Sequence, residues 1–340
     1  MRRAGVLGAT GYTGAVLLSV LLGHPEIEIA LITSNASRGK KISEVFPQFR
    51  GRLEMPLEAT DEDHRGKCDV YFLCLPHGVS GAHAKTLFDG KALIIDLSGD
   101  LRFEDAALYE RHYTAHPAKE LLTQAVYGLP ELHREKLKDA LLVGNPGCYP
   151  TSAILALYPL LKEGLAEQRI FVDSKSGVSG AGREAKAANL FCEVAEGFRP
   201  YNVGVHRHEP EIQKELAKVA DVKVTFVPHL LPMNRGILTT VYGSLKKCAP
   251  TAALLNLYRE TYRDEPFVRV LPEGAFPDTR FVRYSNYCDI ALKSFEDGRF
   301  ILVSAIDNLL KGASGQAVQN MNIALGLEET AGLTFLPQYP

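Results

Sequence analysis

Apolar residues in the first half of the chain form short continuous runs, which alternate with segments of helical periodicity. The runs at residues 2–7, 28–33, 69–75 and 92–97 lack the polar alternation of a half-exposed strand. They are therefore typical of strands that are buried on both faces of a parallel sheet. An apolar helical segment at residues 15–22 follows the first run. This alternation of strand and helix predicts an α/β domain with a doubly wound sheet.

The pattern changes after an apolar helical segment at residues 149–163. Strand-like segments then follow one another, and one helix is expected between the later ones, at residues 251–262. Strands in succession with few crossovers predict an α+β domain on a mostly antiparallel sheet. These strands are expected at residues 169–174, 223–228, 236–242, 284–293 and 299–306.

We therefore expect two domains, residues 1–147 and residues 148–307, which suits a chain of 340 residues. The tail begins with polar residues and glycines and then becomes helical. Its small residues allow close packing against another element. We expect the tail, about residues 308–340, to return to the first domain and complete it.

Three glycines separate the first strand from the first helix. Gly8, Gly11 and Gly14 have the spacing G-x-x-G-x-x-G rather than the stricter G-x-G-x-x-G. Either spacing gives a tight turn, close approach of the backbone to a pyrophosphate, and N–H groups at a helix start. A turn without a ligand is the alternative, but this position favours a Rossmann-type dinucleotide-binding domain. The expected contacts are Gly8, Thr10, Gly11, Tyr12, Thr13 and Gly14.

The second strand ends without the acidic residue that an NAD site uses to bind the ribose 2′-hydroxyl. Residues 34–41 instead carry hydroxyls followed by three cations. This composition suits a 2′-phosphate, so we expect the cofactor to be NADP, bound there by Ser34 and Arg38. A solvated basic loop is the alternative.

Turn residues end the next two strands at the edge where open α/β sheets bind ligands. Leu75 and Pro76 follow one strand and Ser98 follows the other, so we expect all three to contact the cofactor. A Ser/Gly loop at residues 175–183 offers donors to a phosphate or an amide, although a plain surface loop is the alternative. This loop and the start of the tail add Gly177, Ser179 and Asn308 to the expected cofactor contacts.

Residues 143–151, Val-Gly-Asn-Pro-Gly-Cys-Tyr-Pro-Thr, join the last strand of the first domain to a helix. The Asn-Pro-Gly sequence forces a turn, so Cys148 is expected at a strand-to-helix corner. The positive end of a helix dipole lowers the pKa of a thiol and favours the nucleophilic thiolate. A small buried hydrophobe is the alternative role for such a cysteine.

Two histidines flank an arginine just before an expected helix. His206, Arg207 and His208 bring together groups for proton transfer and anion binding, although a lone histidine is more often structural. Glu211 is placed either to orient His208 or to cap the helix. The residues expected to contact substrate are Asn145, Ser179, Arg183, His206, Arg207, Glu211 and Arg235.

Composition limits the classes of partner. The 38 basic and 40 acidic residues leave a net charge of −2, which gives no reason to propose nucleic acid or an anionic membrane. We expect neither a membrane span nor a signal peptide, because glycines break the first apolar run. Six cysteines are scattered without a CxxC pair or zinc-like histidine spacing. We therefore expect no metal site and a reduced, cytoplasmic protein.

These motifs resemble those of the N-acetyl-gamma-glutamyl-phosphate reductases, which are relatives of the aspartate-semialdehyde dehydrogenases. The resemblance covers almost the whole chain, and the stretch Pro-Gly-Cys-Tyr at residues 146–149 is its most specific part. One departure is Ser152, where the family usually has Gly or Ala. The matching segments are residues 8–14, 144–151, 206–212, 232–236 and 307–312.

The resemblance implies NADPH-dependent reduction of N-acetyl-L-glutamyl 5-phosphate to the semialdehyde and phosphate, in arginine biosynthesis. It implies that Cys148 is the nucleophile and forms a thioester, and that His208 is the acid/base, with His206 as runner-up. Arg207, Arg183 or Arg235 would hold phosphate or carboxylate oxygens. The expected large sheet also favours a homo-oligomer, either a dimer or a tetramer.

Other functions stay open on the residues alone. A reductase of aspartyl phosphate or of carrier-bound aminoadipyl phosphate would share this chemistry. A non-catalytic NADP-sensing protein is a third possibility, but it leaves the placement of Cys148 at a corner unexplained. The expected pocket segments at residues 176–183, 203–208 and 232–236 contain arginine and histidine but no Asp or Glu. A free ammonium group would call for an acidic partner, so the pocket favours an N-acylated substrate.

Overall fold

The computed structural model describes residues 1–339, and the chain folds into two compact units. The first unit comprises residues 1–147 and 313–334. The second comprises residues 148–312 and the chain end from Phe335. The boundary thus falls between Gly147 and Cys148, and the tail contributes to both units.

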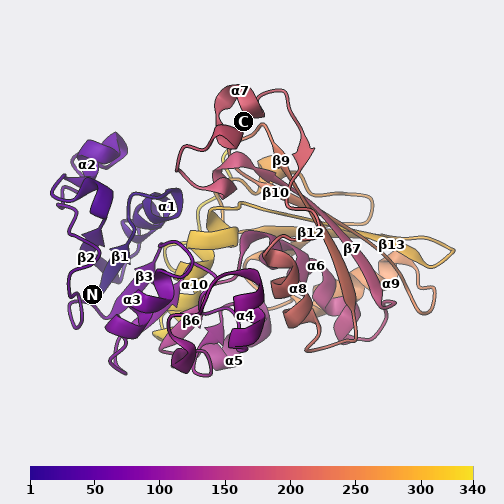
Figure 1. The fold of residues 1–340 in the computed structure, drawn as a ribbon. Coiled ribbons are helices and arrows are strands. Elements are labelled where there is room, and N and C mark those ends of the chain that lie inside the picture. Colours follow the sequence, from indigo (N-terminus) through magenta and orange to yellow (C-terminus); the bar gives the residue numbers. More distant parts are fainter. Residues whose placement is uncertain (340) are drawn as a thin grey trace. The chain divides into compact units, whose positions relative to one another are not determined.

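A six-stranded sheet forms the centre of the first unit (Figure 1). All of its neighbouring strands pair in parallel, which confirms the prediction from the continuous apolar runs. The order β2-β1-β3-β4-β6-β5 places the reversal of winding between β1 and β3, and ligands bind at such a reversal in open α/β sheets. The strands are β1 (Arg2–Leu7), β2 (Ile27–Thr33), β3 (Val70–Leu73), β4 (Leu93–Asp96), β5 (Val126–Tyr127) and β6 (Leu142–Gly144).

Helices connect these strands and include one from the tail. The tail helix α10 (Gly315–Ala324) packs against α1, α5 and β4. Its amide side chains are buried and serve as hydrogen-bonding groups: Gln316 and Asn320 both donate to the Gly128 carbonyl, at 2.8 Å each. The other helices are α1 (Tyr12–Leu21), α2 (Ile42–Val45), α3 (Ser80–Leu87), α4 (Ala106–His112) and α5 (Pro130–Leu137).

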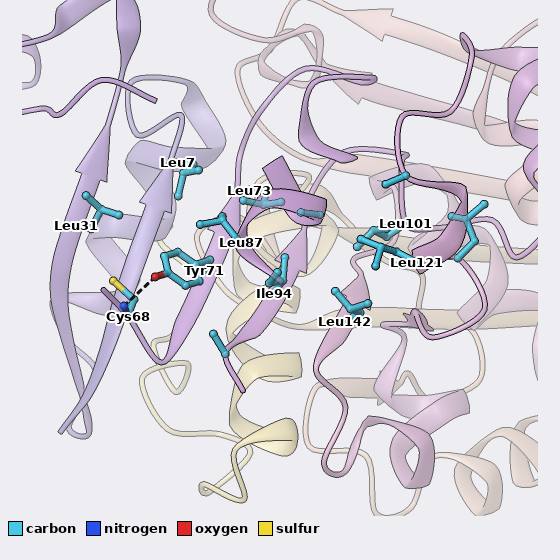
Figure 2. Packing of buried hydrophobic residues seen from close by; sticks show 14 residues of the cluster. Leu7, Leu31, Cys68, Tyr71, Leu73, Leu87, Ile94, Leu101, Leu121 and Leu142 are labelled. Carbon is cyan, nitrogen blue, oxygen red and sulfur yellow. Dashed lines mark hydrogen bonds between the residues drawn. The ribbon is translucent and has the colours of Figure 1, made fainter. Parts of the chain in front are cut away.

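Figure 2 shows the apolar core on one side of this sheet. Leu7, Leu73, Ile94 and Leu142 come from four neighbouring strands and are at most 1% exposed. Burying each such side chain contributes roughly 1.5–3 kcal/mol to folding. Tyr71 lies in this core with its hydroxyl paired, since it accepts from the Cys68 N–H at 2.9 Å and donates to the His64 carbonyl at 2.5 Å.

The second unit is built on a seven-stranded sheet of order β11-β12-β13-β10-β7-β9-β8. Its pairings are antiparallel except for β11 with β12 and β7 with β9. The expectation of a mostly antiparallel sheet is therefore confirmed. The strands are β7 (Arg169–Gly177), β8 (Arg199–Pro200), β9 (Lys223–Leu231), β10 (Ile237–Ser244), β11 (Val268–Val270), β12 (Cys288–Ser294) and β13 (Arg299–Ile306).

Helices cover one face of this sheet. The helix α6 (Cys148–Lys162) packs on β10 and β13, α8 (His208–Leu216) on β9, and α9 (Thr251–Thr261) on β12. Alternate residues of β10, such as Ile237, Thr239 and Val241, are buried under this layer. One remaining helix is the short α7 (Phe191–Val194), and a π-helical turn at Leu310–Ser314 leads into α10.

Ser152, the departure from the family pattern, has hydroxyl partners beneath α6. Its Oγ donates to Thr239 Oγ1 at 3.0 Å and lies 2.7 Å from Ser304 Oγ. Ser174 Oγ lies 2.8 Å from the same Thr239 oxygen. Because these hydroxyls satisfy one another in the core, Ser152 is accommodated without a buried unpaired group.

Some boundaries differ from the expected ones. The strand expected at residues 284–293 begins only at Cys288, because Tyr284 has a left-handed φ of 61° and ends a turn. The short strands β8 and β11 and the helix α7 were not expected. Within residues 1–339 no helix is long and apolar enough to cross a membrane.

Candidate active site

The glycine loop of the first unit has the geometry of a pyrophosphate site. Gly8 has φ of 82°, and a Cβ there would lie 2.3 Å from the Cys74 carbonyl oxygen. A Cβ on Gly14 would lie 2.6 Å from the Gly8 carbonyl oxygen. A Cβ on Gly11, the first residue before α1, would make only an ordinary contact, 3.7 Å from the Gly8 carbonyl oxygen, and no side chain caps the helix. The loop is thus packed against β3 while the start of α1 fits a bound anion.

Ser34, expected near the ribose, lies beside Thr10 of the glycine loop, after the ends of β2 and β1. Thr10 Oγ1 and Ser34 Oγ are 2.8 Å apart, and Ser34 is 5% exposed. Arg38 lies beyond them on the surface, and its Nη2 is 2.6 Å from Glu62 Oε1. A cation is therefore present where a 2′-phosphate is expected, and it is paired with a carboxylate of the same chain.

Two buried carboxylates shape the loops that follow β3 and β4. Asp100 accepts hydrogen bonds from the Gly78 and Gly81 N–H groups, each at 2.8 Å. Asp96 accepts from the Ser98 N–H at 2.8 Å and from the Ser98 hydroxyl at 2.9 Å. Burial, and then the nearby charge of Asp100, raise the pKa of Asp96. The hydroxyl of Ser98 is thus already hydrogen-bonded within its own loop. In the loop after β3, Leu75 is half-buried and Pro76 is exposed.

Asn145 is buried within the first unit and is hydrogen-bonded to several other residues. It is 1% exposed, its Nδ2 donates to the Ala313 carbonyl at 3.2 Å, and its Oδ1 accepts from Asn320 at 3.0 Å. The guanidinium of Arg102 donates to the Asn145 carbonyl at 2.7 Å. Arg102 was not singled out from the sequence, although its position after the turn that ends β4 was a usable signal. These bonds fix the turn that leads to Cys148.

The thiol stands at the first residue of α6. Cys148 follows the turn after β6 and is partly exposed. The π-helical turn lies against it, since a Cβ on Gly312 would be 2.7 Å from Cys148 Cβ. The N-terminal N–H groups of α6 and the dipole of the helix favour negative charge at this position.

An aromatic cluster gathers both histidines over the residue that follows the thiol. The ring of Tyr149 lies 5.7 Å from that of His206 and 5.8 Å from that of His208, and the two imidazoles are 4.9 Å apart. Tyr201 Oη donates to Tyr149 Oη at 3.1 Å. Burial raises the pKa of both phenols, and the proximity of Cys148 raises each further. Neither tyrosine was selected as a site residue from the sequence. The one signal available was that Tyr149 directly follows Cys148.

The two histidines have different environments. Burial lowers the pKa of His206 to about 4, and the charge of Arg207 contributes to the shift. Its Nδ1 accepts a hydrogen bond from the His208 N–H at 3.1 Å. His206 is therefore neutral near pH 7 and supports the start of α8, while His208 is the first residue of that helix.

Three expected contacts meet at the far end of β7. Asn308 Nδ2 donates to Ser179 Oγ at 2.9 Å, and Asn308 Oδ1 accepts from the Gly236 N–H at 2.8 Å. A Cβ on Gly177 would lie 2.7 Å from the Asn234 backbone. Gly177, Ser179 and Asn308 thus form one small polar loop cluster.

The expected anion-binding arginines differ in how firmly they are held. Arg235 Nε is 3.1 Å from Asp307 Oδ2, and its guanidinium stacks 4.6 Å from the Tyr284 ring. Asp307 is fully buried, so an acidic group does reach this pocket segment, but it pairs with Arg235. Arg183 and Arg207 are exposed, and Glu211 is buried in the first turn of α8. No cluster of residues suited to a metal occurs in the described part of the chain.

Comparisons with known proteins agree with this arrangement. Residues 3–140 match the semialdehyde dehydrogenase NAD binding domain, and residues 148–308 match the semialdehyde dehydrogenase dimerisation domain. Aspartate semialdehyde dehydrogenase II from Vibrio cholerae has a similar structure, with a TM-score of 0.74 and 17% identity over 95% of this chain and 98% of that one. The NADP-bound aspartate semialdehyde dehydrogenase of Candida albicans has a TM-score of 0.71 and 18% identity at the same coverage. These likenesses show the fold.

Curated relatives are much more similar in sequence. N-acetyl-gamma-glutamyl-phosphate reductase from Geobacter sulfurreducens is 54% identical, and the one from Geobacter metallireducens is 52% identical. Both alignments cover all of this chain and all of the relative. The chain therefore belongs to the N-acetyl-gamma-glutamyl-phosphate reductase family.

Proposed function

We propose that this protein reduces N-acetyl-L-glutamyl 5-phosphate to N-acetyl-L-glutamate 5-semialdehyde and phosphate, as a step of arginine biosynthesis. The observation that carries the proposal is the site around Cys148. A thiol stands at the start of α6, and the Tyr149 ring that follows it contacts both His206 and His208. The family of the relatives supports the same reaction.

The first half of the reaction transfers the acyl group to sulfur. The Cys148 thiolate attacks the acyl carbonyl carbon, the carbon–oxygen bond to phosphate breaks, and a thioester forms. N–H groups at the start of α6 are suited to hold the oxyanion that develops. His208 takes the proton from the thiol before the attack.

The second half releases the aldehyde. Bound NADPH supplies the hydride that reduces the thioester carbonyl. The resulting alkoxide reforms the carbonyl, the carbon–sulfur bond breaks, and the departing sulfur recovers its proton from His208. His206 does not serve in this step because its pKa of about 4 leaves it neutral and its Nδ1 already accepts a hydrogen bond.

The cofactor is NADP, held in the first unit. The glycine loop and the start of α1 suit the pyrophosphate, and Ser34, Thr10 and Arg38 suit the phosphorylated ribose. The loops after β3 and β4 add Leu75, Pro76 and Ser98. Of these, Ser98 contributes through loop shape, because its hydroxyl is bonded to Asp96.

The substrate is N-acylated, and its anionic groups are held by arginine. Asp307 is a buried acid that reaches the expected pocket segment at residues 232–236, and its carboxylate is already paired with Arg235. That pairing leaves Asp307 unsuited to a substrate ammonium group, which supports N-acetylglutamyl over aspartyl phosphate. The exposed Arg183 and Arg207 supply bidentate donors for phosphate or carboxylate, and Asn145 positions the turn before Cys148.

The second unit self-associates through the face of its sheet that the helices leave uncovered. Phe171 and Tyr242 are paired across β7 and β10 on that face, and they are 53% and 42% exposed. Large exposed apolar side chains in one row are typical of an interface, and the second unit matches a dimerisation domain. We place the protein in the cytoplasm, where its six thiols remain reduced.

The reverse reaction tests the assignment. Purified protein is given N-acetylglutamate semialdehyde, phosphate and NADP, and NADPH formation is followed by absorbance. The proposal predicts phosphate-dependent turnover that exceeds turnover with aspartate semialdehyde. A preference for aspartate semialdehyde would mean that the substrate is aspartyl phosphate rather than N-acetylglutamyl phosphate. Absence of turnover with any semialdehyde would favour a non-catalytic NADP-binding protein.

A further inference from the structure

A run of three acidic residues faces the basic loop that follows β2. Residues 61–63 are Asp-Glu-Asp, and residues 38–41 contain three cations. An ion pair connects the two runs, with Glu62 Oε1 2.6 Å from Arg38 Nη2. The two side chains are 45% and 66% exposed, so solvent and ligands can reach both.

The backbone builds this juxtaposition. The Gly39 N–H donates to the Leu57 carbonyl at 2.9 Å, and the Thr60 N–H donates to Asn35 Oδ1 at 2.7 Å. Thr33 Oγ1 and Thr60 Oγ1 are 2.8 Å apart in the core. The acidic run is therefore tied to the end of β2 by several bonds, and the position of Glu62 does not depend on its own side chain.

Carboxylates and phosphates are both good partners for an arginine guanidinium. A phosphate that binds Arg38 must displace the Glu62 carboxylate, which already pairs with the guanidinium. We propose that Glu62 is a specificity-determining residue, whose carboxylate competes with the cofactor 2′-phosphate for Arg38. This inference rests on the proposed use of NADP.

The competition is modest, because exposed ion pairs are weak. Removing the Glu62 charge should tighten binding of a 2′-phosphate about two- to fivefold, the range that an exposed pair can supply. Ligands that lack the 2′-phosphate do not need Arg38, so their binding should not change. With Glu62 present, the protein therefore prefers NADP over NAD less strongly than it would with Arg38 alone.

Titration calorimetry of Glu62→Gln tests the inference with two fragments, adenosine 2′,5′-bisphosphate and 5′-AMP, which differ only in the 2′-phosphate. Glu120→Gln is a matched control, because Glu120 pairs with Lys85 at 2.6 Å and the two are similarly exposed, at 53% and 57%. The expected result is tighter binding of the bisphosphate by Glu62→Gln alone, with unchanged 5′-AMP binding. In an Arg38→Gln background the effect of Glu62→Gln should disappear, and added salt should reduce it.

The outcomes separate this inference from the cofactor assignment. If the wild type binds both fragments equally, then the NADP assignment fails and the inference fails with it. If the wild type prefers the bisphosphate but Glu62→Gln binds it no more tightly than wild type does, only the inference is overturned. A change that is equal for both fragments, or that persists without Arg38, also overturns it.

Discussion

Gly312 lies directly against Cys148, and a Cβ on this glycine would be 2.7 Å from Cys148 Cβ and 3.2 Å from Cys148 Cα. Atoms that are not bonded do not approach so closely, so any side chain at this position must displace the thiol or the π-helical turn. The glycine therefore allows the turn at Leu310–Ser314 to lie beside the nucleophile.

Gly312→Ala should lower kcat about 100-fold while the protein stays folded, since misplacing a reacting group by about 1 Å costs roughly that factor. Steady-state kinetics and circular dichroism measure the two effects. Gly23→Ala is the control, because its nearest neighbour is the Val20 carbonyl oxygen at 3.6 Å, an ordinary contact. Equal activities of the two variants would mean that the position of the thiol is not critical.

His208→Asn should lower kcat by about 10²–10⁴-fold, the usual scale for a lost general acid or base. His206→Asn should cost less, because His206 acts by holding the start of α8 through its Nδ1. Kinetics of both variants across pH 5–9 provide the comparison. A larger loss in His206→Asn would transfer the proton-transfer role to His206.

The half-buried, neutral His206 should make the folded protein sensitive to acid. In the unfolded chain a histidine binds a proton below pH about 6.5, whereas folded His206 does so only near pH 4. The unfolded state therefore binds more protons in this window, so the free energy of unfolding falls as the pH drops through it. Urea unfolding at pH 7 and pH 5 should show a smaller loss for His206→Asn than for wild type.

His112→Asn, which replaces an exposed histidine on α4, is the control for that comparison. It should leave the acid sensitivity of wild type unchanged. If the free energy of unfolding falls between pH 7 and pH 5 by as much in His206→Asn as in the control, then burial does not hold His206 neutral.

Tyr242→Glu should dissociate the oligomer, because it places a charge in the exposed row formed with Phe171 on the uncovered face of the sheet. Light scattering at several concentrations measures the mass. Val79→Glu alters a residue of the first unit that is also 42% exposed, and it should leave the mass unchanged. A Tyr242→Glu protein with the mass of wild type would place the interface elsewhere.

The sequence predicted the features that depend on local pattern. Continuous apolar runs gave the parallel sheet, and the turn at residues 145–147 placed Cys148 at the start of α6. Features that depend on distant contacts could not be found this way. Nothing in the basic loop at Arg38 indicates that Glu62 will meet it, and nothing near Arg235 indicates its pairing with Asp307.

Strand boundaries failed for a related reason. The strand expected at residues 284–293 starts before β12, which begins at Cys288, because a distant group stabilises the left-handed turn at Tyr284. The Tyr284 N–H donates to Asp307 Oδ2 at 2.7 Å, and Asp307 follows the end of β13. The environment of His206 likewise arises from Tyr149, Tyr201 and Phe226, which come from separate segments.

The most direct test of the thioester mechanism is detection of the acyl group on Cys148. Wild-type protein is mixed with N-acetylglutamate semialdehyde and NADP without phosphate, quenched in acid, digested and examined by mass spectrometry. We expect a burst of NADPH and an N-acetylglutamyl group on the peptide that contains Cys148, with neither in Cys148→Ser. Addition of phosphate before the quench should discharge the label. Phosphate-dependent turnover by Cys148→Ser, or a label on a different residue, would contradict the thioester mechanism.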